Sequence, residues 1–142
     1  MEISDIRRSL RQRIEQARRT SAERRARADA AARAYETFLA DVATPVFQMF
    51  ANALRVEGYP FKVFTPAAGL RLMSDRSSDD YIELTLDTSA DPPVVLSRVN
   101  RGRGSRLVTS ERPIRPDAAI GEISDQDVLT FLLDEIEPFV ER

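Results

Sequence analysis

Apolar and small side chains recur along residues 3–42 at alternating steps of three and four, which is the spacing of a coiled-coil seam. The seam residues are Ile3, Leu10, Ile14, Ala17, Ala28, Ala31, Tyr35, Phe38 and Val42. Arg7, Ser21 and Arg24 are the seam positions that interrupt the pattern. The pattern predicts one long helix in the first 43 residues, with a seam that another surface must cover.

Arginines occupy the positions that flank this seam, while the acids of the same segment fall on the outer face of the helix. The flanking arginines are Arg11, Arg13, Arg18, Arg25 and Arg27. In a two-stranded homodimer the flanking residues of one chain face those of the other, so arginine would largely meet arginine. A plain two-stranded zipper is therefore poorly matched in this stretch.

Two interpretations of these arginines remain open. They are ordinary solvated charges, supported by pairs four residues apart such as Glu15 with Arg19. Alternatively, they face an acidic surface, which would be nucleic acid phosphate, an acidic partner helix or the acidic end of this chain. The last surface is a real competitor, because residues 1–40 hold ten arginines against six acids, whereas residues 117–142 hold one arginine against eight acids.

A proline and a glycine indicate where the next helices begin and end. Pro45 lacks an amide proton and clashes with the preceding turn, so we expect the long helix to break at Thr44, with Thr44 capping a second helix. Gly58 ends that second helix. The sequence thus predicts two regions: a coiled-coil-like oligomerisation or partner segment over residues 1–57 and a small α+β domain over residues 58–142.

From residue 59 the chain consists of short runs of β-forming residues separated by turn residues. The predicted strands are 61–65, 70–74, 81–87, 94–100 and 105–110. Ser124 and Asp127 form a capping-box pattern that begins a last helix, which we expect to lose its regularity at Pro138. The fold class is α+β: a long N-terminal helix broken near Pro45, an antiparallel meander of four to five strands, and a C-terminal helix packed on the sheet.

The predicted helix is much longer than the predicted domain. About 42 helical residues extend for roughly 63 Å at about 1.5 Å per residue. A compact domain formed by the residues after Gly58 has a radius of gyration of about 12 Å, roughly a fifth of that length. Such a helix is marginal alone, so it packs against another chain or folds back as a hairpin near Thr20 and Ser21. We expect homo-oligomerisation to cover it.

The composition removes most common catalytic chemistry. The chain has no histidine and no cysteine, which excludes the common triads, thiol nucleophiles and the usual zinc sites. The remaining candidate metal ligands are the carboxylates of Asp75, Asp79, Asp80, Glu83 and Asp87. Their loop lacks the spacing of a regular calcium loop, and Lys62 precedes them by a whole hairpin. We therefore predict no enzyme, no cofactor and no metal site.

A second group of arginines surrounds two glycines between the last two predicted strands. Arg101, Arg103 and Arg106 lie here, close to Gly102 and Gly104, whose backbone could approach a phosphate closely. No aromatic residue is interleaved for base stacking. An exposed arginine-rich turn is also typical of an ordinary solvated edge, so both interpretations stay open.

Localisation and function follow from these features as expectations. The start shows no secretory signal, and the longest uncharged stretch is the thirteen residues of 42–54, so we expect a cytoplasmic protein with no membrane partner. We predict a non-enzymatic, self-associating adaptor or accessory protein that binds an acidic protein surface through its arginine-bordered seam. The alternative is a sequence-nonspecific nucleic-acid-binding protein that uses the N-terminal helix and the arginine-glycine hairpin.

Overall fold

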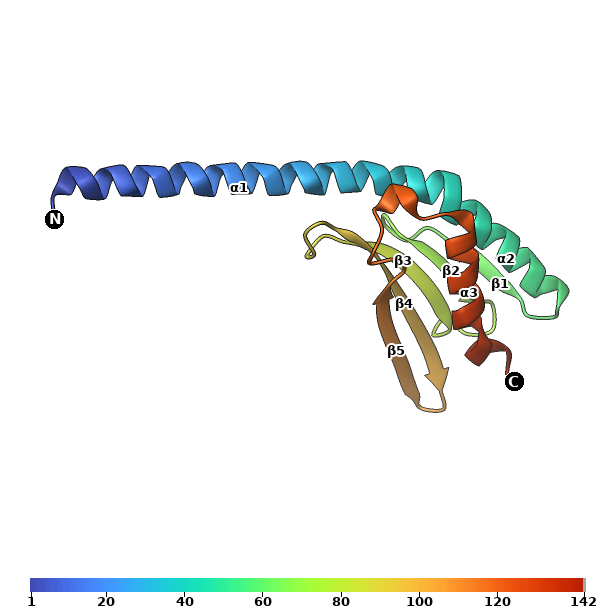
Figure 1. The fold of residues 1–142 in the computed structure, drawn as a ribbon. Helices are drawn as coiled ribbons and strands as arrows, with labels where there is room; N and C mark the ends of the chain where they lie inside the picture. The colour runs from blue at the N-terminus through green and yellow to red at the C-terminus, as the bar shows by residue number, and fades with distance from the viewer. Residues whose placement is uncertain (142) are drawn as a thin grey trace.

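One very long helix extends from a small helix-and-sheet body in the computed structural model, which describes residues 1–141 (Figure 1). The elements in chain order are the helix α1 (Ile3–Phe38), the π-helical turn η1 (Leu39–Ala43), the helix α2 (Thr44–Val56), the strands β1 (Phe61–Phe64), β2 (Leu70–Ser74), β3 (Tyr81–Asp87), β4 (Val94–Arg103) and β5 (Arg106–Pro113), the 3-10 turn η2 (Ile120–Glu122) and the helix α3 (Asp125–Val140). The predicted α+β class is confirmed.

The five strands form one antiparallel sheet in the order β1-β2-β3-β4-β5, so the predicted meander is confirmed. Leu72 pairs with Ile82, and Ile82 pairs with Val99, which places these apolar side chains on one face of the sheet. The helix α3 covers this face, where the Arg112 guanidinium lies 5.0 Å from the centre of the Phe131 ring. The strands β4 and β5 extend three residues beyond the predicted ends, to Arg103 and Pro113.

The long helix does not stop ahead of Pro45 but passes through a π-helical turn into α2. Thr44 has helical dihedral angles (φ −62°, ψ −46°), and its amide donates to the carbonyl of Leu39, so the prediction that Thr44 caps a new helix is wrong. Proline has no amide to donate, and its ring crowds the carbonyl four residues earlier. A wide turn relieves that clash without a loop. The interruption near Pro45 is thus a change of helix type and direction.

The end of α1 and the whole of α2 belong to the same core as the sheet. Tyr35 and Phe38 of α1 and Phe47 of α2 are buried in one cluster with the sheet residues Leu72 and Ile82. Burying a large apolar side chain contributes about 1.5–3 kcal/mol. The region predicted as a separate helical segment, residues 1–57, therefore shares a core with residues 58–141 from about residue 35 onward.

The last helix begins as the sequence predicts. Ser124 Oγ accepts a hydrogen bond from the Asp127 amide, and the Asp127 carboxylate accepts one from the Ser124 amide, which is a complete capping box. Pro138 lies inside the helix, which continues to Val140, so the predicted end at Pro138 is two residues early. Near this end, the rings of Phe139 and Phe61 meet edge to face, with centroids 6.1 Å apart, and fix α3 against β1.

Candidate interaction surfaces

The predicted seam of α1 has two different environments. Ile3 is 77% exposed and Leu10 is 57% exposed, whereas Tyr35 and Phe38 are each only 3% exposed. The transition occurs at Ala28, the first half-buried residue of the helix. We call residues 1–27, all of which are exposed, the overhang. Of the predicted seam residues, Ile3, Leu10, Ile14 and Ala17 are therefore uncovered, whereas Ala28, Ala31, Tyr35 and Phe38 are covered by the chain's own body.

Four large aliphatic side chains form one stripe along the start of the overhang. They are Ile3, Ile6, Leu10 and Ile14, which we call the overhang stripe. Ile6 is 48% exposed and was not among the predicted seam residues, because a strict heptad pattern places Arg7 there instead. A straight helix has 3.6 residues per turn, so a residue three after Ile3 and four before Leu10 shares their face. That spacing is the signal that could have found it.

The overhang leaves the body at an ion pair between α1 and the turn that joins β3 to β4. Arg27 donates two hydrogen bonds of 2.8 Å each to the carboxylate of Asp91, and Arg24 lies 3.7 Å from the same group. The hydrogen bonds from Arg27 lower the pKa of Asp91, and Asp91 in turn raises the pKa of Arg27. Arg27, predicted to contact a partner, is thus already engaged within its own chain.

The other predicted partner-binding arginines of α1 carry no such contact. Arg11, Arg13, Arg18 and Arg25 make no ion pair with any of residues 1–141. The supporting pairs expected along the helix, such as Glu15 with Arg19, are also absent from the ion pairs of that part of the chain. The overhang therefore presents its arginines to solvent, with nine arginines and four acids and a net charge of +5 over residues 1–27.

The arginines of the β4–β5 hairpin form a second basic surface. Arg103 and Arg106 face each other across the tip, where Gly104 has a left-handed φ of +64°. Arg98 pairs with Glu111 at 2.9 Å, but Arg101, Arg103 and Arg106 make no ion pair within the described residues. The tip points away from α1 (Figure 1), so the structure does not bring the two groups of arginines together.

Three of the carboxylates that were weighed as metal ligands are engaged in separate contacts. Glu83 lies 3.0 Å from Arg71, Asp80 accepts a hydrogen bond from the Gly102 amide, and Asp75 lies 3.7 Å from Arg55. Within residues 1–141, no three acidic side chains approach one another closely enough to hold a metal ion. These side chains hold turns and strands in place.

A groove of about 800 Å³ lies between α1, the β1–β2 turn and β3. Its lining is mostly apolar, and two of its polar side chains, Tyr35 and Glu83, already have partners within the chain. The Tyr35 hydroxyl donates to the carbonyl of Ala68 at 3.0 Å, and Glu83 is bound by Arg71. Burial, with a smaller effect from Glu83, raises the pKa of Tyr35 to about 12. Tyr35 therefore keeps its proton near neutral pH.

A smaller groove of about 280 Å³ lies between α2 and α3. Its lining residues are Val46, Met49, Phe50, Ala53, Asp125, Gln126 and Leu129. Met49 is 64% exposed, and Leu133, one turn after Leu129 on α3, is 55% exposed. We call this surface the α2–α3 groove.

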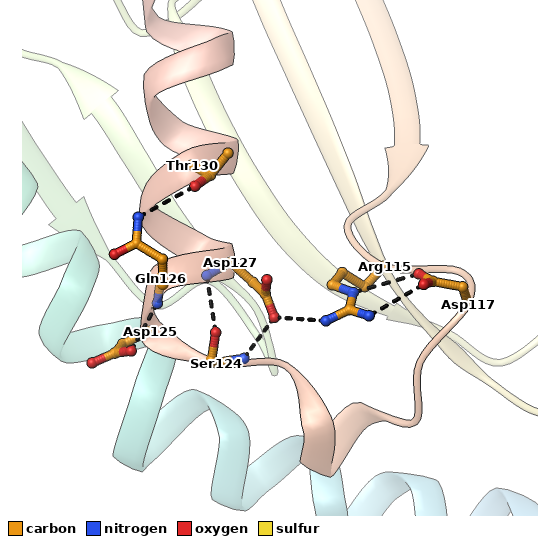
Figure 2. Close-up of polar contacts among 7 residues, drawn as sticks. All are labelled: Arg115, Asp117, Ser124, Asp125, Gln126, Asp127 and Thr130. Atoms are coloured by element: carbon orange, nitrogen blue, oxygen red, sulfur yellow. Dashed lines mark hydrogen bonds and ion pairs between the residues drawn. The ribbon is translucent and has the colours of Figure 1, made fainter.

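One acidic side chain, Asp125, lines the α2–α3 groove at the start of α3. Figure 2 shows Asp125 on the side of the helix away from Arg115, which pairs instead with Asp117 and Asp127. The Arg115 hydrogen bond lowers the pKa of Asp117, and the Ser124 amide is the main cause that lowers the pKa of Asp127. Asp125 has no ion pair among residues 1–141, so its charge is left facing the groove.

Comparison with known proteins adds no relative: no family model, no curated protein and no solved structure matches this chain. No helix within residues 1–141 is long and apolar enough to cross a membrane.

Proposed function

We propose that this protein is a non-enzymatic, self-associating adaptor whose overhang is covered by a second copy of the chain. The observation that carries the proposal is the overhang stripe, because its four aliphatic side chains remain exposed on a part of α1 that the chain's own body does not cover. Burying one such side chain fully contributes about 1.5–3 kcal/mol. The remaining surfaces of the body stay free to hold another macromolecule.

The marginal stability of an isolated helix supports this proposal. A lone helix in water gains little beyond its own hydrogen bonds, and most helices in proteins depend on the packing of an apolar face. The overhang has no such packing, and its nine arginines repel one another along about 40 Å of helix. A second chain that covers the stripe would supply the missing packing.

The composition of the chain and the pairing of two groove residues support the non-enzymatic part of the proposal. The chain has neither histidine nor cysteine. Tyr35 keeps its proton at neutral pH, and Glu83 is bound by Arg71. Binding is therefore the activity that these surfaces support best.

Sedimentation velocity over a wide range of protein concentration tests self-association. We expect the wild-type chain to form a dimer and the variant Leu10→Asp, which puts a charge in the overhang stripe, to be monomeric. Gln12→Asp is the matched control, because Gln12 is exposed on the opposite side of the same helix and should leave the dimer intact. A wild-type chain that stays monomeric at every concentration would overturn the proposal.

The unpaired hairpin arginines favour one second candidate, a nonspecific nucleic-acid binder. Fluorescence anisotropy with short labelled duplex DNA, measured at low and at physiological salt, tests it. If the hairpin contacts phosphates, the variant carrying Arg103→Gln and Arg106→Gln should bind more weakly and reduce the slope of log affinity against log salt by about 0.9 per lost contact. Arg98→Gln, which removes an arginine already paired with Glu111, is the control. No binding at low salt would exclude this candidate.

A further inference from the structure

We propose that the overhang of one copy docks into the α2–α3 groove of a second copy, and that the second copy's overhang docks into the groove of the first. The proposal deepens the proposed function, on which it rests, by naming the surface that covers the overhang stripe. The contact is a helix laid in a groove, in which apolar residues three, four and seven apart enter the cleft.

The apolar residues of the two surfaces match in spacing. Ile3 and Leu10 are seven residues apart on α1, which is about 10.5 Å along a helix. The groove residues Val46 and Ala53 are also seven residues apart on α2 and line the cleft over the same length. Between them, Met49 offers an exposed, flexible side chain of the kind that adapts to an incoming helix.

The charges of the two surfaces are opposite. Residues 117–141 contain no lysine or arginine. Asp125 at the groove, and Asp134 and Glu137 further along α3, are exposed and form no ion pair with any described residue. On the overhang, Arg7 and Arg11 lie to one side of Leu10 around the helix, and neither forms an ion pair with residues 1–141. Docking would bring these arginines to the acids, and opposite charge also accelerates association.

The chain cannot fill its own groove with its own overhang. The helix α1 is continuous from Ile3 to Phe38, and its N-terminal end points away from α2 and α3 (Figure 1). An overhang of 27 residues reaches about 40 Å from the body, far enough to lie on another molecule. An overhang that docks into the groove must therefore come from a different copy.

The competing arrangement, in which two overhangs pair with each other, is less favourable. It places the arginines beside the seam of one helix against those of the other, where like charges repel. Groove docking instead sets these arginines against acids. Because each copy has one overhang and one groove, a twofold axis satisfies both contacts and closes the assembly at two chains.

A single substitution in the groove separates this proposal from self-association in general. We expect Met49→Lys, which places a positive charge where the arginine-rich overhang docks, to be monomeric by sedimentation velocity. Gln48→Lys is the matched control, because Gln48 is an exposed neighbour on α2 that does not line the groove. Circular dichroism melts should show that both variants fold.

These experiments distinguish a failure of groove docking from a failure of self-association. If Met49→Lys remains a dimer while Leu10→Asp is monomeric, the overhang binds another surface, such as a second overhang, and the groove proposal is overturned while self-association stands. If the wild-type chain is a monomer, both proposals fail. If the wild-type chain forms filaments rather than dimers, the closed twofold arrangement is wrong.

Cross-linking between two single-cysteine variants locates the contact directly, because the natural chain contains no cysteine. Ser9→Cys lies beside Ile6 and Leu10 on the overhang, and Gln126→Cys lines the groove. A mixture of the two variants, treated with a short bismaleimide, should give a product that contains one of each chain. Ser9→Cys mixed with Ser105→Cys, at the hairpin tip, is the control and should give little product. Equal cross-linking in both mixtures would overturn the proposal.

Discussion

Arg27 and Asp91 are 64 residues apart in the chain, yet the guanidinium of one donates two hydrogen bonds of 2.8 Å to the carboxylate of the other. Apart from the longer contact of Arg24 with the same carboxylate, no residue earlier in α1 forms a hydrogen bond or ion pair with the described body. The pair marks the point where a helix supported by the body becomes an overhang that needs support from elsewhere.

Replacing Arg27 with glutamine should loosen this junction without unfolding the body. Exposed ion pairs contribute little to global stability, so we expect only a small change in the thermal midpoint. Hydrogen exchange of the amides near residues 20–27 should become faster, because the helix loses its two hydrogen bonds to Asp91 and keeps only the longer contact of Arg24. Arg25→Gln removes an unpaired arginine nearby and should not change the exchange. Equal acceleration in both variants would mean that the pair does not anchor the helix.

The same pair should respond to acid. The hydrogen bonds from Arg27 lower the pKa of Asp91 in the folded chain. The contribution of the pair to folding stability is therefore present above the pKa of an unfolded aspartate, about 4, and is lost as the pH falls through the lowered pKa of the folded chain. Titration of the Asp91 carboxyl carbon by NMR should give a lower pKa in the wild-type chain than in Arg27→Gln. Identical titration curves would contradict this prediction.

Removing residues 2–23 should leave a folded body. The core cluster takes its first buried side chain from Tyr35, and the junction at Arg27 is retained. We expect the shortened chain to melt cooperatively, within a few degrees of the monomeric full-length variant Leu10→Asp. Its far-UV circular dichroism should lose the helical signal of the deleted residues. A shortened chain that no longer melts cooperatively would show that the overhang stabilises the body.

Local patterns in the sequence predicted the sheet and its connections well. The alternation of Ile82 and Leu84 with polar residues indicates the face of β3 that is buried, and the Ser124–Asp127 pattern predicted the start of α3. These features depend on neighbouring residues, where the two-residue period of a strand and the requirements of a helix cap apply directly.

Features that depend on distant segments could not be predicted in this way. The alternation of polar residues with Ile82 and Leu84 indicates an outward-facing Glu83. Glu83 is nevertheless only 8% exposed, because Arg71 from β2 pairs with it and lies 4.1 Å over the Tyr81 ring. The seam of α1 likewise gave no sign that Tyr35 would be covered by its own chain while Leu10 would not. That difference depends on where the sheet packs, which the period of a helix does not encode.

Replacing Ser124 with alanine should destabilise the body by about 1 kcal/mol, the usual cost of losing a helix N-cap. The Ser124 hydroxyl satisfies the Asp127 amide, which would otherwise have no partner in the first turn of α3 (Figure 2). Urea unfolding at neutral pH measures the change. Thr130→Ala, an exposed position in the same helix outside the capping box, is the control and should cause a smaller loss. Equal losses of unfolding free energy in the two variants would show that the capping box does not stabilise the body more than an ordinary exposed position does.

The Asp127 carboxylate should make part of this stability dependent on acid. The Ser124 amide is the main cause that lowers the pKa of Asp127, with a further contribution from Arg115. The stabilisation is therefore present above the unfolded pKa of about 4 and disappears as the pH falls through the lowered folded value. The difference in unfolding free energy between the wild-type chain and Asp127→Asn should shrink over that range. A difference that stays constant would contradict the assignment.

Tyr35 should make the body sensitive to high pH. Burial raises its pKa in the folded chain to about 12, whereas an unfolded tyrosine titrates near about 10. The folded state then binds the Tyr35 proton more tightly than the unfolded state does. The resulting contribution to the free energy of unfolding is complete below about pH 10 and is lost as the pH rises toward the pKa of the folded chain. Tyr35→Phe removes the hydrogen bond to the Ala68 carbonyl and should cost about 1 kcal/mol at neutral pH.

The decisive measurement is the pH dependence of that difference. Because phenylalanine has no proton to lose, urea unfolding of Tyr35→Phe should weaken less between neutral pH and high pH than unfolding of the wild-type chain, and the two stabilities should converge. Tyr59→Phe also removes a hydroxyl that donates to a backbone carbonyl, that of Val140, but it leaves Tyr35 in place and should keep the wild-type loss at high pH. Parallel curves for the wild-type chain and Tyr35→Phe would mean that another group controls alkaline unfolding, because only the buried hydroxyl of Tyr35 distinguishes them.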